Sequence, residues 1–303
     1  MKPVPSSGPD GIAAMNRILA ETAPLARDWS KQFCWQDPAQ GKRCDWYHGS
    51  WQTLRLLGIV TTLTSHAALY VEALRRLARN GDFERIFLSG SADYGLLAIV
   101  LDAYQREGIQ PDVTLVDRCE TPLKLSRWYA ESFGYAVNTV RCDLTAFRSK
   151  LPYDIVCAHS LLSCVPREGH GEIVETWRRQ LRPGGLLLMV NNFYPGSRET
   201  TNRFTPEQIE AYGGRIAAAA NSCPHPEALP APDELKSLAT AFARNMEGSI
   251  LTSQEQLTQL LEDGGFEVTE LRSGEQIARD KPQGTGAPTK AKRDYAWIIA
   301  RRR

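Results

Sequence analysis

The sequence lacks the marks of several protein classes. No apolar run approaches the ~18 residues that span a membrane, and the first residues carry no apolar core of a signal peptide. Its 36 lysine and arginine residues are balanced by 35 acidic residues, and no basic block is interleaved with aromatic residues. These absences predict a cytoplasmic protein with no membrane partner and no nucleic acid partner.

The seven cysteines form no CxxC pair, the usual spacing of two zinc ligands. Four of the seven lie in or beside expected strands, where a reduced thiol behaves as a small apolar side chain. Cys34, Cys44 and His48 come near a metal-like group, but their spacing matches no site that we can justify. We therefore expect no metal.

The most informative segment is 85–117, which reads as a strand, a turn, a helix and a second strand. An apolar run is followed by the small-residue turn 89–95, and the second apolar run ends on Asp117. In such units the start of the helix brings backbone N–H groups to a ligand, and a terminal acid accepts hydrogen bonds from both ribose hydroxyls. The segment predicts a cofactor that contains a nucleoside, although the turn is poor in glycine.

Short apolar strands then alternate with helical patterns. We expect strands at 84–89, 112–117, 136–142, 153–158 and 186–191. We expect helices between them at about 94–107, 121–134 and 172–181. This alternation predicts a parallel sheet covered on both faces. Two later strands, 266–271 and 295–300, are joined by a loop (279–292) too short for a helical crossover, so they should be antiparallel.

The beginning of the chain has a different pattern. Helical periodicity and four of the seven tryptophans before residue 52 predict a helical cap or lid over 1–81, followed by a sheet domain over 82–303. An inserted helical segment is expected at about 196–250. Thr205 and Ser253 each begin a capping-box pattern, which predicts one helix inside this segment and one after it.

With these elements in place, residues 82–303 resemble the class I S-adenosylmethionine (SAM)-dependent methyltransferases. The most specific residues are the strand and turn YDIVCAHSLLSCV (153–165) and the Pro-Gly-Gly turn 183–185 before the fifth strand. The resemblance implies an α/β fold with a doubly wound, mostly parallel, seven-stranded Rossmann-like sheet and an antiparallel last strand. It also implies that SAM is the cofactor.

The resemblance further implies which residues contact the cofactor. Asp117 matches the ribose-binding acid, Gly90 matches the first glycine of the loop, and Asp143 with Leu144 stands where the adenine edge is recognised. Asp93 either takes a polar role in a loop whose later glycines are replaced or caps the following helix. The cap role is likewise the alternative for Asp143. The expected cofactor-binding residues are Ser89, Gly90, Ser91, Asp93, Asp117, Arg118, Asp143, Leu144 and His159.

Two residues that follow strands four and five are candidate catalytic residues. His159 either accepts a proton from the methyl acceptor or only forms hydrogen bonds, and Tyr194 faces the same mouth of the sheet. The expected substrate and lid residues are Trp46, Tyr47, His48, Trp51 and Asn192. Aromatic faces attract a sulfonium cation, although the tryptophans could instead only pack the cap.

The leading hypothesis is in-line methyl transfer from SAM to a small-molecule acceptor by a monomer or homodimer. A second hypothesis keeps SAM but forms azetidine-2-carboxylate from its methionine portion and releases methylthioadenosine. A third is a regulatory protein that binds SAM without turnover. A nicotinamide dehydrogenase is disfavoured, because the turn 90–95 lacks the middle glycine of GxGxxG.

Overall fold

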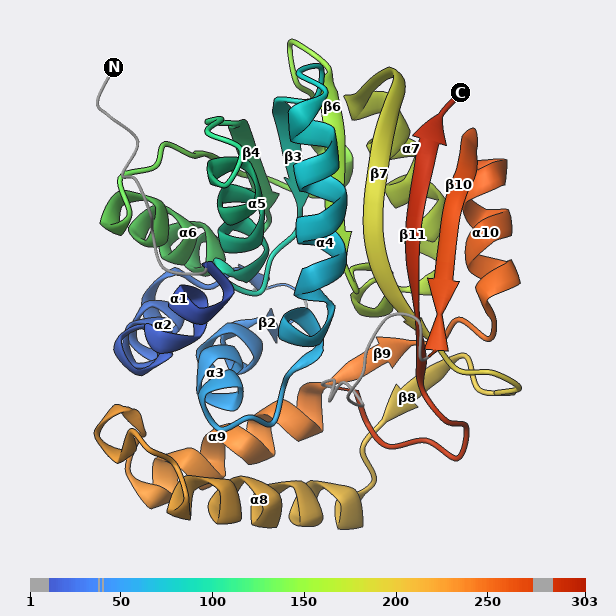
Figure 1. The fold of residues 1–303 in the computed structure, drawn as a ribbon. Helices are drawn as coiled ribbons and strands as arrows, with labels where there is room; N and C mark the ends of the chain where they lie inside the picture. Colours follow the sequence, from blue (N-terminus) through green and yellow to red (C-terminus); the bar gives the residue numbers. More distant parts are fainter. Residues whose placement is uncertain (1–10, 38, 40, 275–285) are drawn as a thin grey trace.

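The computed structural model describes residues 11–37, 39, 41–274 and 286–303. A seven-stranded sheet runs through its centre in the order β10-β11-β7-β6-β3-β4-β5 (Figure 1). Its strands are β3 (Arg85–Ser89), β4 (Asp112–Asp117), β5 (Asn138–Arg141), β6 (Tyr153–His159), β7 (Leu181–Phe193), β10 (Phe266–Ser273) and β11 (Asp294–Arg302). Strand β11 runs opposite to the other six, so its pairings with β10 and β7 are antiparallel and all other pairings are parallel. The predicted fold class is therefore confirmed, while residues 279–285 of the expected loop lie outside the described residues.

Helices cover both faces of this sheet, which explains why the middle of the central strands, 86–88 in β3 and 155–158 in β6, is continuously apolar and buried. One face packs against α4 (Thr62–Arg79), α5 (Gly95–Gln105) and α6 (Glu120–Ser132). The other face packs against α7 (His170–Gln180) and α10 (Gln254–Asp263). Two apolar cores, one on each side of the sheet, thus hold the strand ends in fixed positions.

The N-terminal region contains α1 (Gly11–Arg17), α2 (Leu19–Phe33), a short hairpin and α3 (Asp45–Leu56) before α4. The hairpin pairs β1 (Gln36–Asp37) with β2 (Lys42–Arg43). Although α4 falls inside the predicted cap, it lies along the sheet: the Tyr70 hydroxyl donates to the Ala158 carbonyl at 2.6 Å and accepts from the Val190 N–H at 2.9 Å. The division at residue 81 stays a prediction.

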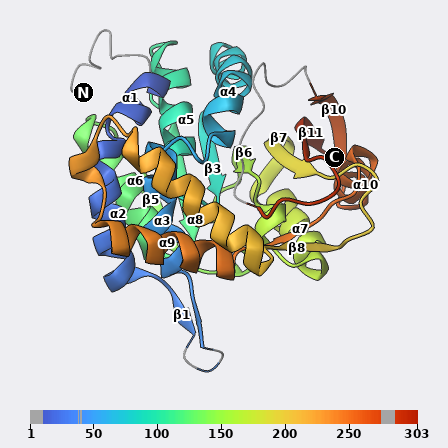
Figure 2. The same cartoon turned by 90° about the horizontal axis from the view of Figure 1, so that it is seen from below.

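The segment after β7 forms a separate layer below the carboxyl ends of the parallel strands. It contains β8 (Thr201–Arg203), α8 (Pro206–Asn221), α9 (Pro232–Asn245) and β9 (Glu247–Ser249). Figure 2 shows α8 and α9 side by side across this end of the molecule. The predicted helix at Thr205 is α8, which has the expected capping box. The other helix of this layer, α9, was not predicted.

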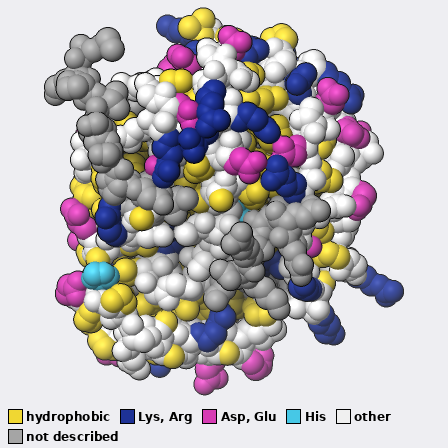
Figure 3. Space-filling view, in the orientation of Figure 1, with side chains coloured by type: hydrophobic (Ala, Val, Ile, Leu, Met, Phe, Trp, Pro, Cys, Tyr) yellow, Lys and Arg dark blue, Asp and Glu magenta, His cyan; other side chains and the backbone are white. Residues whose placement is uncertain are grey.

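The outer side of α4 carries charges of both signs. Figure 3 shows basic side chains next to acidic ones on this face. Arg75 and Arg79 pair with Glu107, and Arg76 pairs with Glu270.

Among the described residues, no helix is long and apolar enough to cross a bilayer.

Candidate active site

A cavity of about 580 Å³ opens at the carboxyl ends of the parallel strands. Its volume is in the range of small-molecule sites. Every residue that the sequence predicted for the site lines this cavity: Trp46, Tyr47, His48, Trp51, Ser89, Gly90, Ser91, Asp93, Asp117, Arg118, Asp143, Leu144, His159, Asn192 and Tyr194. The structure thus brings the set together, and the individual roles stay predictions.

Two walls enclose the cavity. The sheet wall is formed by the turns that follow β3, β4, β6 and β7. The aromatic wall is formed by Trp46, Tyr47 and Trp51 of α3, which pack against Phe242 of α9. In Figure 1 the sheet lies above this space and α3, α8 and α9 lie below it.

Asp117 ends β4 on the sheet wall, and both of its carboxylate oxygens are already oriented. The Ser91 N–H donates to Oδ2 at 2.9 Å, and the Cys119 N–H donates to Oδ1 at 2.7 Å. Burial raises the pKa of Asp117, while His48 and these two N–H groups oppose the shift. The two hydrogen bonds fix the direction of a half-buried carboxylate that still faces the cavity.

Gly90 occupies the turn between β3 and α5 in a conformation that favours glycine. Its φ is +70°, its N–H donates to the Val116 carbonyl at 3.0 Å, and an added Cβ would lie 3.0 Å from Leu161 Cδ1. The neighbouring Ser89 hydroxyl accepts a 2.7 Å hydrogen bond from Trp177 Nε1 of α7. The turn is therefore held close to the cavity, as the resemblance implied for the first glycine.

Asp93 has two sets of partners within the chain. Its Oδ1 accepts a 2.7 Å hydrogen bond from the Gly95 N–H at the start of α5, as expected of a residue that caps this helix, and its polar role toward the cofactor stays a prediction. Its Oδ2 forms an ion pair with Arg55 of α3 and accepts a 3.3 Å hydrogen bond from Gln52 Nε2. The side chains of Asp93 and Arg55 are only 2% and 3% exposed. This pair joins the two walls, and sequence reasoning missed Arg55.

Asp143 and Arg118 also have partners within the chain. Asp143 Oδ1 accepts from the Thr145 N–H at 2.9 Å and the Thr145 hydroxyl at 2.8 Å, so it caps the short helix η1 (Leu144–Ala146). The Arg118 guanidinium lies 4.1 Å from the centroid of the Trp35 ring. The capping role of Asp143 is confirmed, and its position beside Leu144 on the cavity is compatible with the adenine role.

His159 ends β6 and lies beside a second histidine that the sequence analysis missed. His66 of α4 places its Nδ1 3.4 Å from His159 Nε2, and the remaining His66 nitrogen has no hydrogen-bond partner among the described residues. Burial, together with His66, lowers the pKa of His159 to about 3, and burial lowers the pKa of His66 to about 4. Both imidazoles are neutral near pH 7. His159 is therefore a weak base, which favours the hydrogen-bonding role.

The residue after His159 has an unusual backbone conformation. Ser160 has a φ of +54°, and it is the one non-glycine residue with positive φ in the described parts of the chain. Its N–H donates to the Val190 carbonyl at 2.7 Å. Such conformations are concentrated at functional sites. Ser160 also lines the cavity, so this unusual conformation belongs to the sheet wall.

Tyr194 follows β7, and its hydroxyl accepts two hydrogen bonds. Asn202 Nδ2 donates at 3.1 Å and Arg293 Nε donates at 2.9 Å. The Tyr194 proton is thus left to point elsewhere, because both donors approach the oxygen. Nearby, Asn192 Oδ1 accepts from the Ser163 hydroxyl. Arg293 also lines the cavity and was not predicted from the sequence.

The predicted aromatic residues pack α3 against α9 rather than onto the sheet. The ring of Phe242 lies 5.8 Å from Trp46 and 6.0 Å from Tyr47, measured between centroids. Tyr47 in turn lies 5.2 Å from Trp51. The His48 ring stands edge-on to Tyr47, with 5.1 Å between centroids, and its Nδ1 lies 3.6 Å from the sulfur of Cys34. The wall therefore has a partner helix that the sequence did not indicate.

No known protein family model matches the chain, and no curated protein sequence matches it. Solved structures are similar at low identity. Magnesium protoporphyrin IX methyltransferase from Synechocystis, with bound S-adenosylhomocysteine, is 11% identical; the match covers 97% of this chain and 100% of that one, with a TM-score of 0.45. A putative methyltransferase from Bacillus halodurans is 16% identical, with 76% and 97% covered and a TM-score of 0.46.

A SAM-dependent methyltransferase from Methanosarcina mazei is also 16% identical; the match covers 73% of this chain and 93% of that chain, with a TM-score of 0.43. The fold assignment itself rests on the strand order and on the single antiparallel strand β11.

Proposed function

We propose that the protein is a SAM-dependent methyltransferase that acts on a small-molecule acceptor. The observation that carries the proposal is Asp117, a carboxylate at the end of β4 that two N–H groups orient toward a ligand-sized cavity. An acid in this place suits the two hydroxyls of a ribose. The turn at Gly90 lines the same cavity, and its positive φ is a backbone conformation that glycine adopts without strain.

The residues that line the cavity fit this cofactor in separate places. Asp117 would hold the ribose, and Asp143 with Leu144 would lie at the adenine. SAM, when bound, supplies an electrophilic methyl group on a sulfonium. The chain contributes binding, orientation and exclusion of water, which are the main protein contributions to an in-line transfer.

His159 and Tyr194 line the same cavity at the ends of β6 and β7. His159 stays neutral because its pKa is lowered to about 3, so it accepts a hydrogen bond more readily than it stores a proton. Tyr194, held by Asn202 and Arg293, can donate its own hydrogen bond. We infer that these two side chains orient the acceptor. We also infer that the acceptor atom is nucleophilic enough to react without a strong base to deprotonate it.

The enclosure of the cavity favours a small acceptor. The aromatic wall faces the sheet wall across the space, so a large substrate would have to separate α3 and α9 from the sheet. Rings also suit a cationic or apolar acceptor next to the sulfonium.

Formation of azetidine-2-carboxylate remains the second candidate. In that reaction the α-amino nitrogen of SAM bonds to its own γ-carbon, the carbon–sulfur bond breaks, and the amine loses a proton. The loop that would meet the amino-acid end of SAM differs from the family pattern, and its Asp93 forms a buried pair with Arg55. This difference favours the cyclisation.

One experiment separates these reactions. The full chain is incubated with SAM and a metabolite extract, and mass spectrometry follows the nucleoside product. S-adenosylhomocysteine with a methylated metabolite supports the proposal, whereas methylthioadenosine without extract supports the cyclisation. Calorimetry that detects SAM binding without either product favours the regulatory hypothesis, and absence of SAM binding overturns the proposed function.

A further inference from the structure

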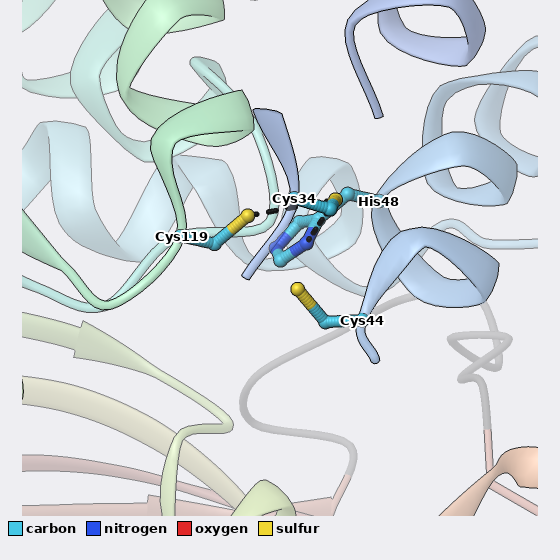
Figure 4. Close-up of side chains that lie close together, drawn as sticks. All are labelled: Cys34, Cys44, His48 and Cys119. Atoms are coloured by element: carbon cyan, nitrogen blue, oxygen red, sulfur yellow. Dashed lines mark hydrogen bonds between the residues drawn. The ribbon is translucent and has the colours of Figure 1, made fainter. Parts of the chain in front are cut away.

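Four potential metal ligands meet between the N-terminal helices and the turn after β4. This group, the Cys/His cluster, consists of Cys34, Cys44, His48 and Cys119. Each side chain offers one ligand atom, and these atoms all lie within 4.8 Å of one another. Figure 4 shows the four side chains pointing toward a common centre. We propose that the Cys/His cluster binds a zinc ion.

Two of the distances between ligand atoms are close to those of a tetrahedral zinc site. The Cys34 and Cys119 sulfurs are 3.5 Å apart, and Cys34 Sγ is 3.6 Å from His48 Nδ1. Ideal zinc bonds of ~2.3 Å to sulfur and ~2.0–2.1 Å to nitrogen give tetrahedral edges of about 3.8 Å and about 3.6 Å. A disulfide would bring the two sulfurs to about 2.05 Å. The sulfurs therefore already stand at the separation that a shared metal requires.

Local structure explains how three of the ligands come together. Cys34 follows the end of α2, and the hairpin β1–β2 returns the chain so that Cys44 precedes α3. His48 lies four positions after Cys44 and hence on the same side of the first turn of α3. The hairpin thus does for Cys34 and Cys44 what a CxxC turn does in a shorter site.

The fourth ligand comes from the sheet. Cys119 lies between the end of β4 and the start of α6, far from the other three in sequence. Spacing alone predicted no metal because only Cys34, Cys44 and His48 are neighbours in the chain. The parallel sheet brings the turn after β4 against the hairpin and so completes the set.

The surroundings suit a closed structural site. Cys34, His48 and Cys119 are buried, and Cys44 is half-buried. Three thiolates, a neutral imidazole and Zn²⁺ leave one excess negative charge. A positive charge that can offset it lies close by. The guanidinium of Arg118, the residue before Cys119, lies over the ring of Trp35, the residue after Cys34. With four protein ligands no coordination position is left open for water, which is typical of structural zinc.

The ion would join the N-terminal helices to the turn beside Asp117, the residue proposed to bind the ribose. The N–H of Cys119 donates to Asp117 Oδ1 at 2.7 Å, so the position of the Cys119 backbone sets the direction of the carboxylate. Cys44 and His48 belong to the edge of the aromatic wall. A zinc ion here fixes both walls of the cavity relative to each other, whichever ligand the cavity binds.

The direct test is the metal content of the full chain, purified without chelators from zinc-supplemented cells and measured by inductively coupled plasma mass spectrometry. We expect about one zinc per chain. Cys44→Ser and Cys119→Ser should each lower it several-fold, and the matched control Cys223→Ser, whose cysteine lies outside the cluster, should retain it. Protein that contains no zinc, even after reduction and incubation with zinc chloride, overturns the proposal, as does another metal in its place.

A second measurement on the unmodified chain covers the case in which the variants do not fold. Native alkylation is read out peptide by peptide, with and without a chelator. Zinc ligation predicts that Cys34, Cys44 and Cys119 become reactive several-fold faster when the chelator is present. Cys157, buried in β6, and Cys223 should react at unchanged rates. Chelator-independent rates, or a disulfide between Cys34 and Cys119 in the purified protein, contradict the proposal.

Discussion

The two walls of the cavity are built by different physical means. On the sheet wall, hydrogen bonds from backbone N–H groups fix the turns at the ends of the strands. One example is the bond from the Ser91 N–H to the Asp117 carboxylate. On the aromatic wall, two helices distant in sequence meet through ring contacts such as that between Trp46 and Phe242. Directional hydrogen bonds fix a geometry, whereas ring contacts tolerate small shifts. We infer that the sheet wall fixes the position of the cofactor and that the aromatic wall adapts to the shape of the acceptor.

The largest expected effect comes from breaking the ion pair that joins the walls. Arg55→Ala leaves the Asp93 carboxylate buried without its charged partner, which should lower the free energy of unfolding by about 3–5 kcal/mol. Urea denaturation measures the loss. The matched control is Lys31→Ala: its pair with Glu234 also links α2 to α9, but the side chains are 63% and 49% exposed. That variant should lose at most about 1 kcal/mol. Equal losses would mean that the buried pair does not hold the walls together.

The second effect concerns the neutral histidines behind the sheet wall. His159 and His66 have pKa values lowered to about 3 and about 4, with the Tyr295 ring 4.9 Å from His66 and Tyr70 packed beside His159. The unfolded chain binds protons near pH 6.5, so it takes up more protons than the folded chain below that value. Stability should be complete above pH 6.5 and fall by about 2–4 kcal/mol toward pH 5.

Urea denaturation between pH 7 and pH 5 checks this dependence. His66→Phe removes one of the two groups and should reduce the slope by roughly one proton. The control His225→Ala changes an exposed histidine between α8 and α9 and should leave the slope unchanged. A slope that is the same in His66→Phe and in the parent protein would show that the pair does not titrate as its burial requires.

Most of the sheet wall could be predicted from the sequence. Apolar runs interrupted by polar turns locate the strand ends, and parallel strands bring those ends to one edge, so Asp117 and His159 were placed correctly on the cavity. The glycine at position 90 was recognisable because its turn follows an apolar run directly. These signals are local, and each needs only a few neighbouring residues.

The partners from distant segments could not be predicted in the same way. Nothing near Asp93 indicates Arg55, and nothing near Cys34 indicates Cys119, because such contacts arise only when the helices dock on the sheet. α9 is a different case, since its buried residues recur at helical spacing. They are Leu235, Ala239, Phe242 and Ala243. That signal was present in the sequence and was passed over.

The third effect tests the binding role of the sheet wall. Asp117→Ala should weaken SAM binding by ~1–3 kcal/mol, because hydrogen bonds to a charged group are lost. Isothermal titration calorimetry measures the affinity. Asp112→Ala serves as the control, since Asp112 begins the same strand β4 at the end away from the cavity. Unchanged affinity in Asp117→Ala would remove this residue from the site and with it the main support for the proposed cofactor.

The smallest expected effect is the ring–ring contribution of the adaptable wall. Trp46→Ala removes ring contacts to Tyr47 and Phe242, at a cost of about 0.5–1.5 kcal/mol beyond the lost apolar burial. Trp128→Ala removes another half-buried tryptophan, on α6 and away from the cavity. If the walls divide the work, only Trp46→Ala should lower the rate of product formation, and SAM affinity should stay within about twofold of the parent value in both variants, a difference below ~0.5 kcal/mol. A loss of SAM affinity in Trp46→Ala would show instead that the aromatic wall also holds the cofactor, because an acceptor-binding wall has no contact through which to change it.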